Sequence, residues 1–311
     1  MHTTTPTPAS NVRHLCRFGL AACLSLSLTG VAAQDIRLTD EIGREVHLHA
    51  PAQRIVSLAP HVTELLFAAG AGAAVVGVVS YSDHPPEARQ LPQVGSYTNV
   101  DMEAVAALRP DLVVAWHSGN RAVHLDKLEA LGIAVYINEP RTLEAVADSI
   151  EALGRLAGTE AQAVQAASAF RNRHNELAAR YRARPPVRMF YQIWNQPLMT
   201  VNDQHLISDV IRLCGGINVF GTLPALAPKI GEESVLAANP EAIVASGMGE
   251  ARPEWLDQWR RWPQLTAATQ GNLYFVPPDL IQRHTPRILD GASQLCAALE
   301  ETRRKRAGHP D

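Results

Sequence analysis

The sequence predicts an α/β protein with two lobes, each built on a central, mostly parallel sheet, joined by one long helix. Two observations support this prediction. Short apolar runs alternate with helical patterns in both halves of the chain, and short connections between them favour parallel sheets covered on both faces. Between the halves, residues 159–184 form a long helical pattern that ends at Pro185. We therefore expect lobes at residues 34–158 and 185–311, with a bridging helix at 159–184.

The bridging segment has the spacing of one continuous helix. Side chains that would share its apolar face recur every three or four residues, at Val164, Ala167, Phe170, His174, Leu177 and Tyr181. Thr159 followed by Gln162 matches a capping box at the helix start. At about 1.5 Å per residue the segment spans roughly 35 Å, enough to cross a small domain as a rigid connection.

Residues 1–33 have the three-part pattern of a secretory signal peptide. Two arginines precede an apolar run over residues 18–31, which ends in small residues. We expect cleavage after Ala33. The run is short for a bilayer and contains several Ser, Thr and Gly, which argues against a transmembrane anchor. A lipoprotein-like box ends at Cys23, but few apolar residues precede it, so we expect cleavage after Ala33 rather than lipidation at Cys23.

The composition is typical of an ordinary globular protein. The chain is 46% hydrophobic and 19% charged, with a formal net charge of -3, which argues against disorder, a coiled coil and a nucleic-acid-binding arm. Removal of the signal peptide takes away two arginines and no acidic residue, so the mature chain is more acidic. We expect no nucleic-acid partner.

Two of the four cysteines lie in the predicted signal peptide, which leaves Cys214 and Cys296. In an exported protein an even pair most often forms a disulfide. Neither residue has a second Cys or His at metal-ligand spacing, so we expect no zinc site on them. The sequence predicts a Cys214–Cys296 disulfide.

The elements of the first half follow a polar lead-in that begins at Gln34. Short apolar runs, typical of buried strands, alternate with amphipathic patterns. The expected strands are residues 54–59, 73–80, 111–116 and 133–137, and the expected helices are residues 61–69, 101–108, 120–131 and 142–156. A loop over residues 81–99 carries three prolines and two tyrosines.

The same alternation begins again after the bridging helix. The expected strands are residues 187–194, 241–246 and 272–277, and the expected helices are residues 205–214, 232–238, 253–261 and one from about Pro286 past Glu300. Three tryptophans at helical spacing, Trp255, Trp259 and Trp262, are expected in the core of this half.

The two halves share one local pattern. Residues 103–115 align without a gap against residues 233–245, and Glu103 and Glu233 fall at matching positions. Both glutamates stand near a predicted helix N-terminus, where the helix dipole favours a carboxylate. The alternative is that any helix–Pro–strand unit of an α/β fold would match this well.

The chemistry-bearing motifs of common enzymes are missing from the sequence. There is no Gly-x-Ser-x-Gly, no phosphate-binding glycine loop, no His-Glu-x-x-His and no dinucleotide fingerprint. The twelve histidines are scattered, so we predict no metal site. A secreted α/β enzyme remains the alternative from another functional class.

Aromatic side chains stand where predicted strands end, at Tyr81, Trp116 and Trp194, and Tyr97 lies in the Pro-rich loop. Ligands of open parallel sheets bind outside the carboxyl ends of the strands. Aromatic faces there suit a large, flat, partly apolar ligand. The alternative is that each ring packs against its own lobe.

Several segments together resemble a known family. They are RIVSLAPHVTELLFAAG, VVSYSDHPPEARQLPQVGSY, ALRPDLVVAWHSGN, LEALGIAVYI, LCGGINVF and the TPRI and QLCAAL pieces of the last helix. They resemble the cobalamin-binding branch of the periplasmic binding proteins of bacterial ABC importers, whose helical-backbone class also binds ferric siderophores and haem. The resemblance implies two lobes bridged by a rigid helix (class III), and a periplasmic monomer without enzymatic activity or cofactor. It implies that cobalamin or a related corrinoid is passed to a membrane permease, with haem or a ferric siderophore as the alternative ligand.

The resemblance also implies roles for individual residues. Tyr81, Tyr97 and Trp116 match first-lobe ligand contacts, with Tyr97 where the family has Trp. Asp279 and Arg283 match second-lobe ligand contacts. The same resemblance implies that glutamates placed like Glu103 and Glu233 dock onto arginines of a two-fold symmetric permease.

The sequence also departs from the family pattern. Second-lobe aromatics are replaced by Leu198 or Met199 and by Ala227, and a small residue after the first strand is replaced by His61. Its position after the first strand makes His61 either a plain helix-start residue or, as a bolder hypothesis, a residue that faces the ligand and ligates its cobalt or iron through a neutral imidazole. These departures leave the exact ligand open.

Overall fold

The computed structural model describes residues 1–7, 35–247 and 251–308. The chain divides into two units, Met1–Ala33 and Gln34–Asp311, and the second contains the fold described below. Most of the predicted signal peptide, including Cys23 and the cleavage site after Ala33, lies outside the described residues. Within the described residues, no helix has the length and apolar character needed to cross a membrane.

A two-stranded antiparallel ribbon precedes the first large sheet. It consists of β1 (Ile36–Thr39) and β2 (Glu45–Leu48), where the sequence analysis expected only a polar lead-in. That expectation was wrong. Apolar and polar residues alternate in both strands, so one face of the ribbon packs on the core while the other faces solvent.

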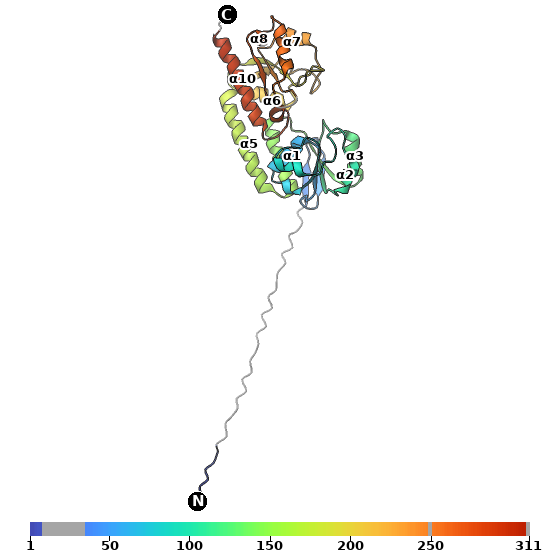
Figure 1. The fold of residues 1–311 in the computed structure, drawn as a ribbon, viewed down its shortest axis with the longest axis vertical. Helices are drawn as coiled ribbons and strands as arrows, with labels where there is room; N and C mark the ends of the chain where they lie inside the picture. The colour runs from blue at the N-terminus through green and yellow to red at the C-terminus, as the bar shows by residue number, and fades with distance from the viewer. Residues whose placement is uncertain (8–34, 248–250, 309–311) are drawn as a thin grey trace. The chain divides into compact units, whose positions relative to one another are not determined.

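The first large sheet is parallel, as predicted. Its strands are β3 (Ile55–Ser57), β4 (Val75–Val78), β5 (Leu112–Trp116) and β6 (Ala134–Asn138), in the order β4-β3-β5-β6. Its helices are α1 (Pro60–Ala68), α2 (Met102–Ala107), α3 (Ala122–Ala130) and α4 (Leu143–Ala157), with 3-10 turns η1 (Gly72–Ala74) and η2 (Pro86–Gln90). Both faces of the sheet are covered, since alternate β5 residues belong to different apolar clusters, one shared with α1 and α4 and the other with α2 and α3 (Figure 1).

The second large sheet is also parallel. Its strands are β7 (Val187–Gln192), β8 (Gly216–Asn218), β9 (Ala242–Ala245) and β10 (Leu273–Phe275), in the order β10-β9-β7-β8. Its helices are α6 (Leu206–Leu213), α7 (Glu232–Ala238), α8 (Thr266–Thr269), α9 (Pro278–Ile281) and α10 (Ile288–Gly308), with the 3-10 helix η3 (Glu254–Arg261). The short elements β8, α8 and α9 were not predicted from the sequence, and the 3-10 helix η3 replaces a predicted α-helix. Trp259 in η3 is buried, and Trp255 and Trp262 pack against the same apolar cluster, as predicted.

The two sheets have the same strand order. In each four-stranded sheet, the strand that comes first in the chain lies between the second and the third, and the fourth lies next to the third at the edge of the sheet. The segments that matched in sequence are therefore equivalent in structure, because α2 leads into β5 and α7 leads into β9. Glu103 and Glu233 are each the second residue of their helix, and both are exposed.

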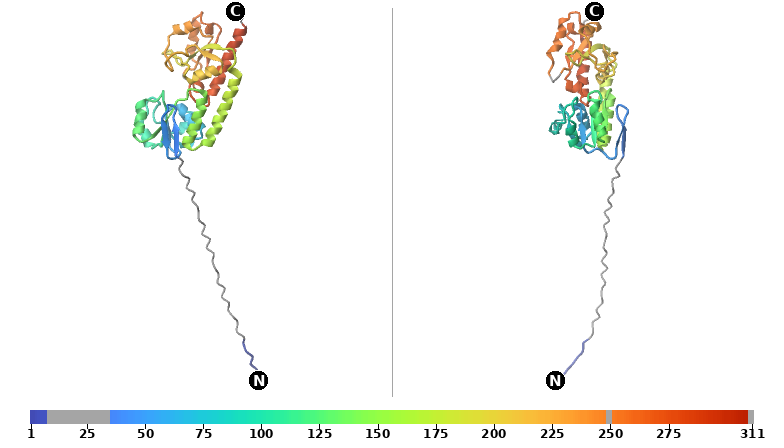
Figure 2. Two further views of the ribbon diagram at one scale, coloured as in Figure 1. Left: turned by 180° about the vertical axis from the view of Figure 1, so that it is seen from behind. Right: turned by 90° about the vertical axis from the view of Figure 1, so that its right-hand side faces the viewer.

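The long helix α5 (Glu160–Tyr181) lies between the two halves in sequence and packs against both. It contacts α4 of the first half, and α6 and α10 of the second (Figures 1 and 2). Its buried face contains Ala163, Ala167, Phe170 and Leu177. Val164 was assigned to that face in error and is 52% exposed.

The predicted capping box at the start of α5 was also wrong. Thr159 makes no side-chain cap, and its hydroxyl instead donates a 2.6 Å hydrogen bond to the carbonyl of Ala69. A tertiary contact therefore replaces the local one, and it joins the start of α5 to the end of α1.

The predicted disulfide is confirmed. Cys214, directly after α6, is bonded to Cys296 in α10 with an S–S distance of 2.04 Å. The bond joins the first and the last helix of the second half inside the main apolar core.

Candidate ligand-binding site

The strand order of the first sheet marks a place where ligands bind. After β3 the chain moves to one side to form β4, and later to the other side to form β5. In open α/β sheets, ligands bind outside the carboxyl ends of the strands at such a switch point. The residues that follow β3 include His61, and Trp116 is the last residue of β5.

Aromatic rings meet at this switch point. The rings of His61 and Trp116 are edge to face with centroids 5.2 Å apart, and the rings of Tyr97 and Trp116 are 5.6 Å apart. His61 is buried, Trp116 is partly buried, and Tyr97 is 36% exposed. The structure thus brings together three residues that the sequence analysis singled out.

Asn120 holds this group in place. Its side-chain Oδ1 accepts a 2.6 Å hydrogen bond from the backbone N–H of Trp116. Its Nδ2 donates to the carbonyls of Leu58 and Tyr97, at 3.0 and 2.8 Å. Asn120 is buried, and the sequence analysis included it only as the start of a helix, which in fact begins at Ala122.

The ring of Trp116 also lies on the backbone of Gly119. A Cβ added at Gly119 would stand 1.8 Å from Cε3 of Trp116. Since real Cβ atoms do not approach a ring so closely, any larger residue at this position would displace the Trp116 side chain.

The second half contributes two histidines to the group. His284 follows α9, and its ring centroid lies 5.5 Å from that of His61. The ring of His205, the residue before α6, lies 5.5 Å from His284 and accepts a hydrogen bond from the N–H of Ile207. Nothing in the spacing of the scattered histidines indicated that these would meet.

These histidines are neutral at neutral pH. Burial contributes most to a pKa of His61 well below its usual range, and the neighbouring His284 and Arg283 lower it further. Burial lowers the pKa of His284 to about 4 and that of His205 to about 3. Within the described part of the chain, His61 Nε2, His284 Nδ1 and Trp116 Nε1 are buried atoms without a hydrogen-bond partner. A polar group or a metal ion of a ligand is the kind of partner that such nitrogens take.

A group of ion pairs lies where the two halves meet. Arg283 Nη1 is 2.9 Å from Glu64 and 2.7 Å from Asp83, and its Nη2 is 3.0 Å from Asp279. Arg287 donates two hydrogen bonds to Glu64, at 2.6 and 2.9 Å. The predicted ligand residues Asp279 and Arg283 are thus adjacent and engaged with each other.

The sequence analysis missed the remaining members of this group. The side chain of Glu64 is 2% exposed, and a buried carboxylate is stable only when it is paired, as it is here with two guanidinium groups. Glu64, Asp83 and Arg287 all lie in segments that carried the family resemblance, but no local pattern marked them as site residues.

Two predicted site residues lie apart from the ring group. Tyr81 follows β4, is 74% exposed and has a positive φ of 67°. Trp194 follows β7, at the switch point of the second sheet, and its Nε1 donates to the carbonyl of Gln196 at 2.9 Å. In the described residues neither makes a ring contact with Trp116 or His61.

A surface hollow of about 590 Å³ opens beside the ion pairs. It is lined by residues of both halves, among them Glu64, Phe67, His84, Pro85 and Arg287. It contains none of the predicted ligand residues. We therefore place the candidate site at the ring group, where strand topology and unpartnered polar atoms coincide.

Several known proteins are similar to this chain. Residues 55–280 match the family model described as periplasmic binding protein. The chain is 38% identical over 251 residues to a vitamin B12-binding protein of Vibrio cholerae, covering 80% of this chain and 90% of the relative.

Solved structures with the same fold include the periplasmic vitamin B12 binding protein BtuF of Vibrio cholerae. The TM-score is 0.75 at 36% identity, and the match covers 81% of this chain and 98% of that one. The periplasmic heme-binding protein RhuT of Roseiflexus has a TM-score of 0.68 at 22% identity, covering 81% and 99%, and shares the fold alone.

Proposed function

Because this chain belongs to the periplasmic binding protein family, we propose that it captures cobalamin or a related corrinoid and delivers it to the membrane permease of an ABC importer. The observation that carries the proposal is the ring group of His61, Tyr97 and Trp116 at the switch point of the first sheet. A flat macrocycle with polar side groups matches aromatic faces beside unpartnered buried nitrogens. The function is binding and transport, without catalysis.

The ligand would lie between two lobes, residues 34–158 and 185–311, with the bridging helix at 159–184. Tyr81, Tyr97 and Trp116 would contact it from the first lobe, and Trp194 from the second. Because the strands of each sheet are parallel, their carboxyl ends lie at one edge of that sheet, and the loops that carry these residues follow them there.

Asp279 and Arg283 would bind polar groups of the ligand from the second lobe. Arg283 offers several N–H donors, and Asp279 offers acceptors beside them. Arg283 is also paired with Glu64 and Asp83. A ligand group that binds Arg283 would therefore either replace one of these carboxylates or bind the guanidinium beside them.

We assign to His61 the ligation of the ligand's cobalt or iron. Its imidazole is neutral, its buried Nε2 lies near the Asn138 side chain without a well-formed hydrogen bond in the described residues, and its ring contacts that of Trp116. A change from His61 to Ala should alter the visible absorption spectrum of bound aquocobalamin. An unchanged spectrum at full occupancy would remove this role.

Glu103 and Glu233 are the proposed docking points for the permease. They are exposed, stand at equivalent positions in two sheets of equal strand order, and lie in the first turn of their helices. Charged residues of this kind set orientation and encounter rate when two proteins meet. One carboxylate on each lobe would align the receptor across two permease subunits.

We further propose export to the periplasm by a signal peptide cleaved after Ala33, rather than lipidation at Cys23. The Cys214–Cys296 disulfide suits an oxidising compartment. In this proposal the mature protein is a monomer and has no nucleic-acid partner.

Haem is the second candidate ligand, because the buried, neutral His61 and His284 are of the type that binds haem iron. The departures at Leu198, Met199 and Ala227 also remove aromatic rings expected of a cobalamin receptor. Titration of the mature protein with cyanocobalamin, haemin and ferric siderophores separates the candidates. Saturable binding of cyanocobalamin tighter than that of haemin is the expected outcome.

A further inference from the structure

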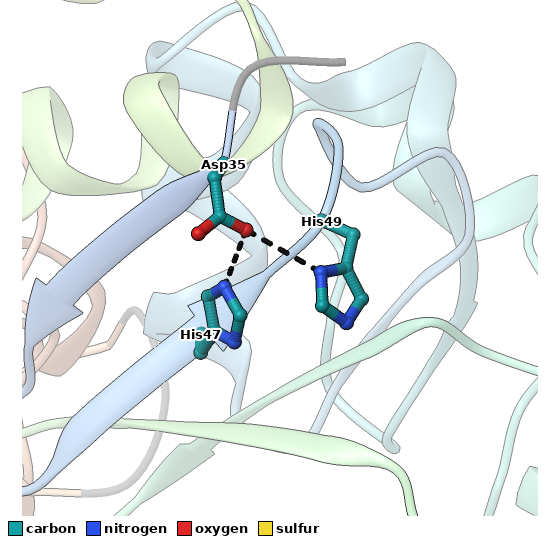
Figure 3. A group of neighbouring side chains, drawn as sticks. All are labelled: Asp35, His47 and His49. Atoms are coloured by element: carbon teal, nitrogen blue, oxygen red, sulfur yellow. Dashed lines mark hydrogen bonds and ion pairs between the residues drawn. The ribbon is translucent and has the colours of Figure 1, made fainter.

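Three potential metal ligands meet on the solvent face of the β1–β2 ribbon: Asp35, His47 and His49 (Figure 3). The ribbon pairs Ile36 with Leu48 and Arg37 with His47, so the next pair outward is Asp35 opposite His49. Successive side chains of a strand point to opposite faces. Residues 35, 47 and 49 therefore share one face, while Val46 and Leu48 are buried on the other.

The donor atoms of the three side chains converge. Oδ1 of Asp35 is hydrogen-bonded to Nε2 of His47 and lies 3.4 Å from Nδ1 of His49. One ligand atom of each residue lies within 4.8 Å of the other two. In a tetrahedral zinc site with bonds of about 2.0 to 2.1 Å, neighbouring ligand atoms are roughly 3.3 Å apart. Small rotations of these side chains, which are 34 to 90% exposed, suffice to reach that spacing.

The charges around the three residues permit a cation. Asp35 supplies a carboxylate, and its Oδ1 is hydrogen-bonded to Nε2 of His47. Arg37 lies on the same face, 3.4 Å from Oδ2 of Asp35. Its positive charge weakens the binding of a metal cation at the three residues. Glu45 lies 3.8 Å from Arg37 and offsets part of its charge.

We propose that Asp35, His47 and His49 bind a divalent transition-metal ion, with Zn²⁺ as the best match to two imidazoles and one carboxylate. A water molecule would fill the fourth position. The ion would join the start of β1 to the end of β2 and so fix the edge of the ribbon. It shares no residue with the ring group, so this inference does not depend on the proposed function.

The test is a titration of tag-free mature protein, dialysed against a chelator and free of corrinoid, with Zn²⁺ alone. Calorimetry should show one site in the micromolar range or tighter at neutral pH. Binding should weaken at acid pH, because protons compete for the imidazole nitrogens. A second readout is the shift of the His47 and His49 imidazole resonances on addition of Zn²⁺.

Substitutions distinguish Zn²⁺ binding at this site from nonspecific Zn²⁺ binding to surface histidines. His47→Ala and His49→Ala should each weaken Zn²⁺ binding at least tenfold, whereas the exposed control His117→Ala should leave it unchanged. Arg37→Gln should strengthen binding, because it removes a nearby positive charge. Absence of binding, or equal affinity in His49→Ala and His117→Ala, would overturn the proposal. The folding of each variant is checked by circular dichroism.

Discussion

The backbone N–H of Trp116 donates a 2.6 Å hydrogen bond to the side-chain Oδ1 of Asn120. The Nδ2 of the same amide donates to the carbonyls of Leu58 and Tyr97. One buried side chain thus joins the ends of β3 and β5 to the loop that carries Tyr97. Asn120 is therefore a positioning residue for the ring group and need not touch the ligand itself.

Replacing Asn120 with Ala removes all three hydrogen bonds and leaves buried backbone groups unpaired. We expect the free energy of unfolding to fall by about 2 to 3 kcal/mol, and cobalamin affinity to fall as the rings of Tyr97 and Trp116 lose their fixed positions. Chemical denaturation and ligand titration measure the two effects. The matched control is Asn172→Ala on the exposed face of α5, which should change neither.

Gly119→Ala separates positioning from stability in the same experiment. It keeps the hydrogen bonds of Asn120 but places a Cβ on the Trp116 ring, so the ring must move. Affinity should fall in this variant too, whereas Gly308→Ala, which meets no atom within 4 Å, should have no effect. Normal affinity with a displaced Trp116 ring would exclude Trp116 as a ligand contact.

Acid should destabilise the protein through His61, His205 and His284. Their pKa values in the folded state lie below the unfolded value of 6.5, so the unfolded chain binds more protons in this range. Stability is fully present above pH 6.5 and is lost as pH falls toward the folded values. For three such groups the loss between pH 6.5 and 5 is about 5 kcal/mol, and burial of Glu41, which raises its pKa to about 7, offsets about 2 kcal/mol of that loss.

Chemical denaturation across this pH range measures the loss. His284→Gln should remove roughly a third of the histidine contribution, and the exposed His117→Gln should leave it intact. In a Glu41→Gln background, where the opposing carboxyl is absent, a stability that does not change between pH 6.5 and 5 would mean that the three histidines are protonated in the folded protein.

Loss of the Cys214–Cys296 disulfide should destabilise the second half. The bond spans a sequence separation of 82 residues, for which the chain-entropy model gives about 4 to 5 kcal/mol. A double change to Ala should lower the free energy of unfolding by that order under oxidising conditions. Under reducing conditions the wild type and the variant should have nearly equal stability, and a persistent difference would point to packing of the sulfur atoms instead.

Reversal of the two docking charges should stop transport without affecting binding. The double variant Glu103→Lys and Glu233→Lys should bind cobalamin normally and fail to support uptake through the permease. The control reverses two exposed charges on α5, Glu160→Lys and Glu176→Lys, and should transport normally. Normal uptake by the double variant would show that the permease docks elsewhere.

Local patterns were enough to predict the large elements of the fold. The strands at residues 54–59 and 111–116 are short apolar runs, and α5 has a helical repeat that ends before two prolines. The disulfide followed from cysteine number once the signal peptide was set aside. Two features were predicted wrongly from local patterns. The alternation at Ile36–Thr39 and Glu45–Leu48 forms a β-ribbon and not a polar lead-in, and the Thr159 hydroxyl makes a tertiary hydrogen bond instead of capping α5.

The candidate site was only partly predictable, because its contacts join distant parts of the chain. Strand ends pointed to Trp116, but the pair of Arg283 and Glu64 is separated by 219 residues. No periodicity encodes such a pair. The same is true of the contact between His61 and His284, which depends on how the two halves pack.

The most direct test of the account is an equilibrium titration of purified mature protein with cyanocobalamin, haemin and ferric siderophores, read by calorimetry and by tryptophan fluorescence. We predict saturable, one-to-one binding of cyanocobalamin in the micromolar range or tighter, with weaker binding of haemin and siderophores. Trp116→Ala should weaken the binding of cyanocobalamin. Absence of saturable corrinoid binding, or tighter binding of haemin or of a siderophore, would contradict the assignment as a cobalamin receptor.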